Sequence, residues 1–338
     1  MKILVTGGAG FIGSNFIKYW LKKHPKDRIT NLDKLTYAGN LNNLKDIEKD
    51  KRYTFVKGNI CNKKLVDKLV KGKDLIVHFA AESHVDRSID GPEEFVKTNV
   101  EGTLVLLEAA LKHGGIRFHH ISTDEVFGEL PLNNPKATCH EDMVYDPRSV
   151  YSASKAASDH LVRAYYATHK LPITISNCSN NYGPYQYPEK LIPLAITRAI
   201  MDQEIPVYGN GKQVRDWIHV EDHCIGIEKC IKKGKIGETY LFGGNGEKQN
   251  IWIIKQILKQ LNKPKDLIVY VGDRKGHDLR YAIDFSKAQK KLNYKPSKTV
   301  DKWLEDTVQW YVDNEQWWKP LKKKADVLAE KYLEKRIK

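Results

Sequence analysis

The sequence predicts an α/β fold in which a mostly parallel, doubly wound sheet carries helices on both faces and a smaller α/β domain follows. Three observations support this prediction. Short β-branched or apolar runs alternate with helical patterns in the first half, a glycine-rich turn follows the first run, and loops rich in Asn, Pro, Tyr and Gly begin near Cys178. Repeated strand, helix and strand units form right-handed crossovers, which give a parallel sheet covered by helices.

The expected elements of the first half follow one another closely. Apolar and β-branched runs predict strands at residues 2–7, 28–33, 53–59, 74–81 and 116–122. Helical spacing predicts helices at residues 11–24, 61–72, 93–113 and 151–170. We interpret residues 1–177 as the first domain and residues 178–338 as a second, interleaved domain that closes over the carboxyl edge of the sheet. A helix and a strand at about 217–242 are expected to return to the first domain.

Composition limits the class of protein. With 338 residues and 41% apolar side chains the chain is an ordinary globular protein, and it contains no apolar run of the roughly 18 residues that span a membrane. The start of the chain enters the glycine-rich turn too soon for a secretory signal. The five cysteines are odd in number and form no Cys-x-x-Cys pair, which predicts no disulfide framework and no metal site, and which favours the cytoplasm.

The chain is basic, because its 56 Lys and Arg exceed its 42 Asp and Glu by 14. This balance permits an anionic partner, but the lysines lie mostly on the expected outer faces of helices. They do not form one arginine-rich patch laced with aromatic side chains, so we predict no nucleic-acid partner.

The glycine-rich turn, VTGGAGFIGSNF, places Gly7, Gly10 and Gly13 between the first strand and the first helix. Glycines permit a tight turn and a close approach to a pyrophosphate, which the helix N-terminus also favours. Asp33 ends the second strand twenty residues after Gly13, where a carboxylate accepts hydrogen bonds from ribose hydroxyls. The turn therefore predicts dinucleotide binding, and Asp33 favours NAD over NADP because it would repel the additional phosphate.

Two further groups of residues suggest chemistry. Tyr151 and Lys155 are four residues apart, on one face of a predicted helix, where the ammonium ion is expected to lower the pKa of the phenol. Thr123, Asp124 and Glu125 stand where the strand in HHISTDEVFG ends. Side chains of neighbouring extended residues diverge, so each of the three is expected to meet a different atom of a ligand.

These motifs resemble the extended short-chain dehydrogenase/reductase superfamily, and the resemblance covers essentially the whole chain. Within it the sequence is similar to the dTDP-glucose 4,6-dehydratases, through the segments AAESHVDRSI, STDEVFG, YSASKAASDHLV, NCSNNYGPYQYPEKLIP, QVRDWIHVEDH and DRKGHDLRYAID. Related nucleotide-sugar epimerases share the tyrosine and the lysine but lack the Asp-Glu pair. GDP-mannose dehydratases keep the glutamate without the aspartate.

The resemblance implies conversion of dTDP-glucose to dTDP-4-keto-6-deoxyglucose and water with bound NAD. Tyr151 would take the O4 proton while hydride leaves C4, and Thr123 would hydrogen-bond O4. The C4 ketone acidifies the hydrogen at C5, which Glu125 would remove while Asp124 protonates the departing C6 hydroxyl. The hydride would then return to C6. Two carboxylates in unequal environments can supply the acid and the base.

The resemblance also implies a Rossmann-type NAD-binding domain, a sugar-nucleotide-binding domain and residues for each. The implied cofactor-binding residues are Gly7, Gly10, Phe11, Ile12, Gly13, Asp33, Lys34, Leu35, Thr36, Asn59, Ile60, Ala80, Ala81, Ser83, Thr98, Tyr151 and Lys155. The implied substrate-binding residues are Ser83, His84, Thr123, Asn180, Lys190, Arg215, Asn250, Arg274 and His277. The chain departs from the family pattern at Asn59, where an Asp usually meets the adenine amino group, and at Phe127, where a Tyr is usual.

Two alternatives remain open at this stage. A nucleotide-sugar 4-epimerase would use the same tyrosine and lysine without losing water from its substrate. A catalytically idle module would sense NAD or bind nucleic acid through its charge, and the intact set from Thr123 to Lys155 argues against it. The resemblance further implies a homodimer that pairs the helices at 93–113 and 151–170 of two copies.

Overall fold

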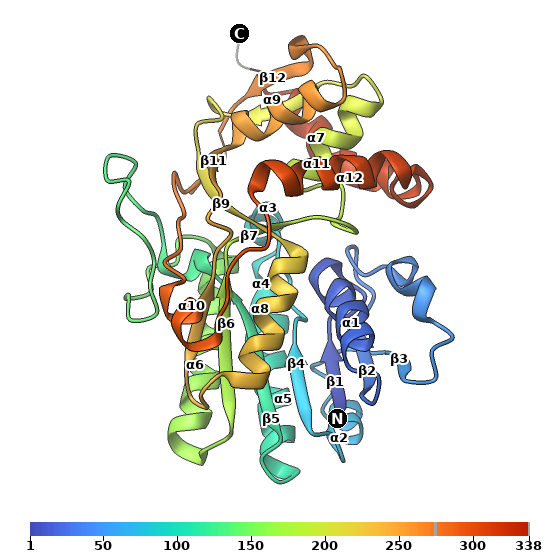
Figure 1. Cartoon of the computed structure of the whole chain (residues 1–338), viewed down its shortest axis with the longest axis vertical. Helices are drawn as coiled ribbons and strands as arrows, with labels where there is room; N and C mark the ends of the chain where they lie inside the picture. Colours follow the sequence, from blue (N-terminus) through green and yellow to red (C-terminus); the bar gives the residue numbers. More distant parts are fainter. Residues whose placement is uncertain (274–275, 337–338) are drawn as a thin grey trace.

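The computed structural model describes residues 1–273 and 276–336, and its main feature is a seven-stranded parallel sheet (Figure 1). The strands lie in the order β10-β6-β5-β4-β1-β2-β3, and every neighbouring pair is parallel. Their bounds are β1 Lys2–Thr6, β2 Arg28–Asp33, β3 Tyr53–Lys57, β4 Leu75–His78, β5 Arg117–Thr123, β6 Ile173–Cys178 and β10 Thr239–Phe242. The predicted α/β fold with a doubly wound parallel sheet is confirmed.

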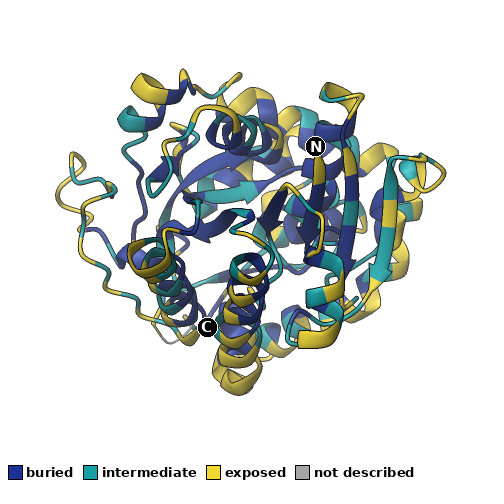
Figure 2. Ribbon diagram, turned by 90° about the horizontal axis from the view of Figure 1, so that it is seen from below, coloured by how far each residue is buried: buried dark blue, intermediate teal, exposed yellow. Residues whose placement is uncertain are grey.

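Both faces of this sheet are buried, which explains its apolar strands. Along β1, Ile3 and Val5 pack on one face and Leu4 packs on the other. Helices α1 (Phe11–Lys23) and α8 (Val220–Lys233) cover the first face. The second face is covered by α2 (Lys63–Val70), α5 (Gly102–Lys112) and α6 (Val150–His169). Figure 2 shows the buried strands between helices whose outer sides are exposed.

The strand order positions the functional site. Connections run outward in one direction from β1 to β3 and in the other from β4 to β6, so the order reverses between β1 and β4. In open parallel sheets, ligands bind in the crevice outside the carboxyl ends of the strands at such a reversal. The glycine-rich turn follows β1 and the Thr123–Glu125 segment follows β5, so both lie at this edge.

The later part of the chain forms small sheets and a helical layer over this edge (Figure 1). One sheet has the order β11-β9-β7, and the other pairs β12 with β8. A core of apolar side chains joins α7, α9 and α11 to Trp318 of α12. The bounds are β7 Asn180–Tyr182, α7 Leu191–Ile200, β8 Ile205–Tyr208, β9 Val214–His219, β11 Glu247–Gln249, α9 Asn250–Gln260, β12 Ile268–Val271, α10 Ser286–Leu292, α11 Val300–Asp313 and α12 Glu315–Leu333.

The structure differs from the predicted elements in two places that matter. The helix predicted at 93–113 is a short helix α4 (Pro92–Phe95), a π-helical stretch (Val96–Glu101) and α5. The segment predicted at 217–242 divides, because α8 and β10 join the main sheet layer while its first residues belong to β9 of a small sheet. The domain boundaries at 177 and 178 stay a prediction.

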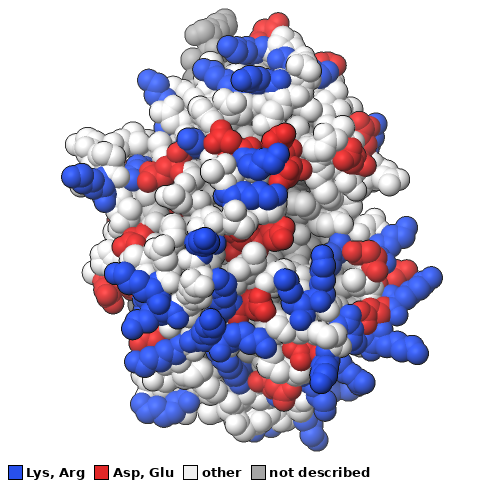
Figure 3. All heavy atoms as spheres, in the orientation of Figure 1, with Lys and Arg blue, Asp and Glu red and all other residues white. Residues whose placement is uncertain are grey.

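The surface is rich in Lys and Arg, as its composition requires. Figure 3 shows these side chains gathered over the lower half of one face, with Asp and Glu between them. Over residues 1–273 and 276–336, no helix is long and apolar enough to cross a membrane. In the same residues, no group of three or more His, Cys, Asp or Glu is arranged to hold a metal ion.

Candidate active site

The turn between β1 and α1 forms a cradle that only glycines can line. Gly7 has a φ of 72°, and a Cβ there would lie 2.6 Å from the backbone nitrogen of Ala80. A Cβ on Gly13 would lie 2.4 Å from the Gly7 carbonyl oxygen. The N-cap of α1 is Gly10, which has no side chain to occupy the first N–H groups of the helix. These groups are therefore available to an anion such as a pyrophosphate.

Asp33 is held against this cradle by two backbone hydrogen bonds. Its Oδ2 accepts from the N–H of Ala9 at 2.9 Å, and its Oδ1 accepts from the N–H of Leu35 at 2.8 Å. Burial raises the pKa of the Asp33 carboxyl, while the two backbone bonds act in the opposite direction. The carboxylate is thus fixed in orientation, with lone pairs left for hydroxyl donors of a ligand.

A cavity of about 320 Å³ opens from this cradle along the carboxyl ends of the strands. All the predicted cofactor-binding residues line it except Leu35, which contributes its backbone to the orientation of Asp33. Asn59 also lines this cavity. Its amide oxygen already accepts a hydrogen bond from the Cys61 N–H at 2.9 Å, and this bond competes with the hydrogen bond that the oxygen was expected to accept from the adenine amino group. Phe127 is buried edge-on to Tyr145, in an apolar cluster outside the cavity lining.

The three residues after the HHIS run enter the same cavity, with a backbone that differs from the expected one. Strand β5 ends at Thr123, and Asp124 and Glu125 lie on a 3-10 turn, Asp124–Phe127. Thr123 caps this turn, because its Oγ1 accepts from the N–H of Glu125 at 3.3 Å. The expectation that all three continue an extended strand is wrong, since the cap turns the chain directly after Thr123.

The turn gives the two carboxyl groups unequal surroundings. Asp124 is 1% exposed, whereas Glu125 is half-buried. Burial raises the pKa of Asp124 well above its ordinary value, and the charges of Glu125 and Asp216 raise it further. Among the described residues, the Oδ2 atom of Asp124 is buried without a hydrogen-bond partner. Burial therefore favours the neutral, protonated form of Asp124 and leaves a polar atom for a ligand.

Tyr151 and Lys155 both lie on α6, which starts with a reciprocal capping box between Ser149 and Ser152. Burial raises the pKa of Tyr151 well above its ordinary value, and the charge of Glu125 raises it further, whereas the Thr123 side chain lowers it. The predicted lowering of the phenol pKa by Lys155 is therefore wrong for the chain alone.

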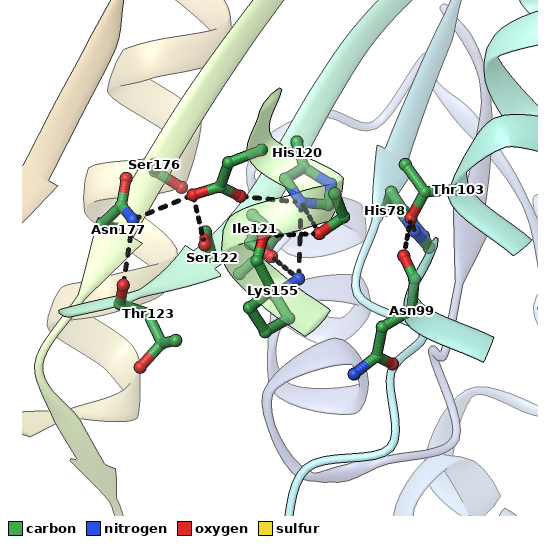
Figure 4. A network of polar contacts seen from close by, with 12 residues as sticks. His78, Asn99, Thr103, His120, Ile121, Ser122, Thr123, Lys155, Ser176 and Asn177 are labelled. Carbon is green, nitrogen blue, oxygen red and sulfur yellow. Dashed lines mark hydrogen bonds and ion pairs between the residues drawn. The ribbon is translucent and has the colours of Figure 1, made fainter. Parts of the chain in front are cut away.

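The Lys155 ammonium contacts two residues of strand β5. Its Nζ donates to the Ile121 carbonyl at 2.8 Å and lies 3.4 Å from Nε2 of His120 (Figure 4). Burial lowers the pKa of Lys155 to about 8, so the group still carries its proton at neutral pH.

A second cavity of about 190 Å³ continues from the first and shares Ser83, Glu125, Asn180 and Lys190 with it. Of the predicted substrate-binding residues, Ser83, His84, Asn180, Lys190, Arg215, Asn250 and His277 line this second cavity, and Thr123 lines the first. Arg274 lies outside the described residues.

Polar atoms within the second cavity suit an anionic, hydrogen-bonding ligand. Within residues 1–273 and 276–336, the Oδ1 atoms of Asn180 and Asn250 are buried without a hydrogen-bond partner. The Arg215 side chain donates to the Asp278 carbonyl at 2.8 Å and stacks over the Tyr281 ring at 4.5 Å, which holds its guanidinium group in place. The lining thus combines cationic and amide groups, which bind phosphate and nucleoside oxygens.

Aromatic residues of the second cavity were missed by the sequence analysis. Tyr208 ends β8 and Tyr332 lies on α12, and their rings meet edge to face at 4.8 Å in the cavity wall. The two positions are far apart in the sequence and belong to no local motif. The packing of α12 beside β8 brings them together, so no signal within either segment could have identified them.

Comparisons with known proteins agree with this geometry. Residues 4–307 match the family model described as GDP-mannose 4,6 dehydratase. The chain is 48% identical to dTDP-glucose 4,6-dehydratase of Escherichia coli, over 94% of this chain and 95% of that protein. Its fold superimposes on the NAD-bound dTDP-glucose 4,6-dehydratase of Streptomyces venezuelae with a TM-score of 0.92 and 46% identity, over 95% of this chain and 100% of the other.

Epimerases are more distant. The UDP-glucuronic acid 4-epimerase of Bacillus cereus, solved with UDP-glucuronic acid and NAD, has a TM-score of 0.86 but only 28% identity, over 93% of this chain and 99% of that protein.

The burial of Asp124 predicts a pH-dependent effect on stability. Because its folded pKa is raised, the wild-type protein loses stability as pH rises from the unfolded pKa of about 4 through the folded value. We expect Asp124→Asn to remove this loss, so that the free energy of unfolding of the variant rises relative to that of wild type between pH 4 and pH 8. Urea unfolding at both pH values measures the difference.

The exposed residue Asp142 provides the control, since Asp142→Asn is expected to change little at either pH. A stability difference between Asp124→Asn and wild type that stays constant from pH 4 to pH 8 would contradict the assignment of a neutral Asp124.

Proposed function

This chain belongs to the GDP-mannose 4,6-dehydratase family, among its dTDP-glucose 4,6-dehydratases, and from that premise we propose how its two cavities perform the reaction. The activity is the conversion of dTDP-glucose to dTDP-4-keto-6-deoxyglucose and water, with NAD as the cofactor. One observation supports the assignment of residues most strongly: a neutral, buried Asp124 stands beside the half-buried Glu125 in the cavity that also contains Tyr151 and Lys155.

The first cavity fits NAD. The Gly7–Gly13 cradle and the uncapped N-terminus of α1 suit its pyrophosphate, and the oriented Asp33 carboxylate suits the adenosine ribose. The chemistry that NAD supplies when bound is reversible hydride transfer, from C4 of the sugar and later to C6, together with a positive charge that favours the phenolate of Tyr151.

Tyr151 and Thr123 act on the hydroxyl at C4. Both side chains line the first cavity, so a sugar O4 placed between them can bond to both. Tyr151 accepts the O4 proton as the C4 ketone forms, and the ammonium of Lys155 stabilises the developing negative charge within the same buried site. Because C4 must be oxidised temporarily, a reaction without net oxidation requires a dinucleotide-binding fold.

Glu125 and Asp124 perform the elimination. The ketone at C4 makes the C5 hydrogen acidic, and Glu125 removes it as the base. Burial favours the protonated form of Asp124, which donates its proton to the C6 hydroxyl as water leaves. The different surroundings of the two groups support Asp124 as the acid and Glu125 as the base.

The second cavity is proposed to hold the rest of the sugar nucleotide. Arg215 and Lys190 suit the diphosphate, and the unpartnered amide oxygens of Asn180 and Asn250 accept from hydroxyl or N–H donors. Tyr208 and Tyr332 offer flat aromatic faces for the nucleoside. The second cavity meets the first at Ser83 and Glu125, so one substrate can reach both cavities.

The dehydratase and the epimerase assignments are distinguished by the product. The wild-type protein, incubated with dTDP-glucose, is expected to give a product that has lost one water and that carries a methyl group at C6 in its NMR spectrum. A 4-epimer of unchanged mass would identify an epimerase instead. The much higher identity to dehydratases than to the epimerase supports the first outcome.

Removing the base is expected to block elimination more than binding. We predict that Glu125→Gln lowers kcat by about 10²- to 10⁴-fold with a KM within about threefold of wild type, because the lost group acts on a proton. Steady-state rates of product formation measure both constants. Glu129→Gln is the matched control, since Glu129 lies four residues along the chain, pairs with Arg148 and lines neither cavity. Equal losses in the two variants would refute the role of Glu125.

We further propose a homodimer located in the cytoplasm. All five cysteines are free thiols, which suits a reducing compartment. Leu104 on α5 and Val96 in the adjoining π-helical stretch are exposed apolar side chains beside α6, where a second copy can cover them.

The dimer predicts a measurable change in mass. Leu104→Glu places a charge in the proposed interface and is expected to convert the protein from twice the chain mass of 38.8 kDa to the monomer. Light scattering after gel filtration measures this. Val144→Glu alters an exposed valine in a loop and is expected to leave the dimer intact. A monomeric wild-type protein would exclude the proposal.

A further inference from the structure

A buried polar network that includes His120, Ser122, Lys155 and Asn177 lies beneath the active site (Figure 4). The carboxylate of this network belongs to Asp159. Asp159 lies one turn after Lys155 on α6 and is fully buried. Its Oδ2 accepts from Oγ of Ser122 at 2.8 Å, from the hydroxyl of Tyr145 at 2.8 Å and from Nδ2 of Asn177 at 3.3 Å. Its Oδ1 lies 3.2 Å from Nε2 of His120. The mechanism proposed above uses none of these five groups.

The network joins the helix that carries Tyr151 and Lys155 to the strands that end at the reacting groups. Ser122 immediately precedes Thr123 on β5, and the Nδ2 group of Asn177 on β6 also donates to the Thr123 carbonyl at 2.9 Å. A single carboxylate on α6 therefore contacts two strands beside Thr123. A change in its position shifts Thr123 and α6 relative to each other.

The same network also reaches the ammonium group of Lys155. Nε2 of His120 lies 3.4 Å from Nζ of Lys155 and 3.2 Å from Oδ1 of Asp159, so one imidazole nitrogen stands between the opposite charges. Burial lowers the pKa of His120 to about 4, so the ring is neutral at neutral pH and does not cancel either charge. The pKa of Asp159 is lowered by His120, Lys155 and Ser122 against the effect of burial, so it is a carboxylate.

Ionisable groups face Lys155 from each element packed around it. They are His78 of β4, His120 of β5, Cys178 of β6 and Asp159 of α6 itself. Burial keeps both imidazoles neutral and raises the pKa of the Cys178 thiol, so that the thiol is uncharged. Asp159 is thus the one charged group of this set, and its carboxylate favours the charged form of Lys155.

We propose that Asp159 is a positioning residue of the dehydratase reaction: the charge of its carboxylate acts on the Lys155 ammonium one turn away, and through Ser122 and Asn177 it fixes α6 against Thr123. Asp159 touches neither cavity, so it acts on the reaction through Lys155 and Thr123. Its charge matters separately from its hydrogen bonds, which distinguishes this role from that of a residue needed only for packing. The inference rests on the proposed function, because the readout is the rate of dehydration.

The experiment is the pH dependence of kcat for wild type, Asp159→Asn and Tyr145→Phe, each with its bound NAD measured. Asp159→Asn keeps the size of the side chain and removes its charge, so Lys155 loses its proton at lower pH. The alkaline limb of the pH profile of kcat is expected to shift to lower pH by about one unit or more, with KM within about twofold of wild type. Tyr145→Phe removes one hydrogen bond to Asp159 but keeps the charge, and its alkaline limb is expected to stay in place.

If Asp159→Asn does not fold, Asp159→Glu tests whether the charge at this position sets the alkaline limb of the kcat profile. The longer side chain keeps the charge, so the alkaline limb is expected to remain within about 0.3 pH units of wild type even if kcat falls. A limb that moves equally in the Asn and Phe variants, or that moves by a full unit in the Glu variant, would overturn the proposal. A wild-type protein without dehydratase activity would instead refute the proposed function, so the two failures are distinguishable.

Discussion

The burial of one carboxyl group at the end of β5 is the constraint on which the active site depends. Asp124 is enclosed because the chain turns immediately after Thr123, and enclosure makes its neutral form the stable one. Glu125, the next residue, is half-buried in the same cavity. A shift of the turn by one residue would exchange the two environments and with them the acid and the base. The reaction therefore depends on a backbone feature as much as on the identity of the two carboxylates.

The parallel sheet explains how distant segments meet at this point. The carboxyl ends of β1, β2, β4, β5 and β6 lie along one edge, so the glycine cradle, Asp33 and the Thr123–Glu125 segment line one cavity. Helix α6 adds Tyr151 and Lys155 from the side, and the later small sheets and helices cover the continuation of the cavity. In the proposed mechanism, the oxidation and the elimination thus take place in one enclosure, from which neither the ketone nor the reduced cofactor needs to leave.

Local patterns predicted the fold and a few residues of the cavity lining, because these depend on strand periodicity, glycine turns and spacing along one helix. The other lining residues were predicted from the family resemblance. The cradle at Gly7, the position of Asp33 and the shared helix of Tyr151 and Lys155 all follow from sequence spacing. Three-dimensional packing determines what the patterns could not show. The direction of the Lys155 ammonium depends on Ile121 and His120 of another element, and the pairing of Tyr208 with Tyr332 depends on α12 lying beside β8.

The central claim is that hydrogen removed from C4 is held within this enclosure and returned to C6 of the same molecule while the two carboxyl groups remove water. The most direct measurement uses dTDP-glucose deuterated at C4, mixed with an equal amount of substrate that carries no deuterium but has ¹³C throughout the sugar. The account predicts that the dehydrated product carries deuterium at C6, and only in molecules without ¹³C. Deuterium found in ¹³C-labelled product, in solvent or in free reduced cofactor would contradict it.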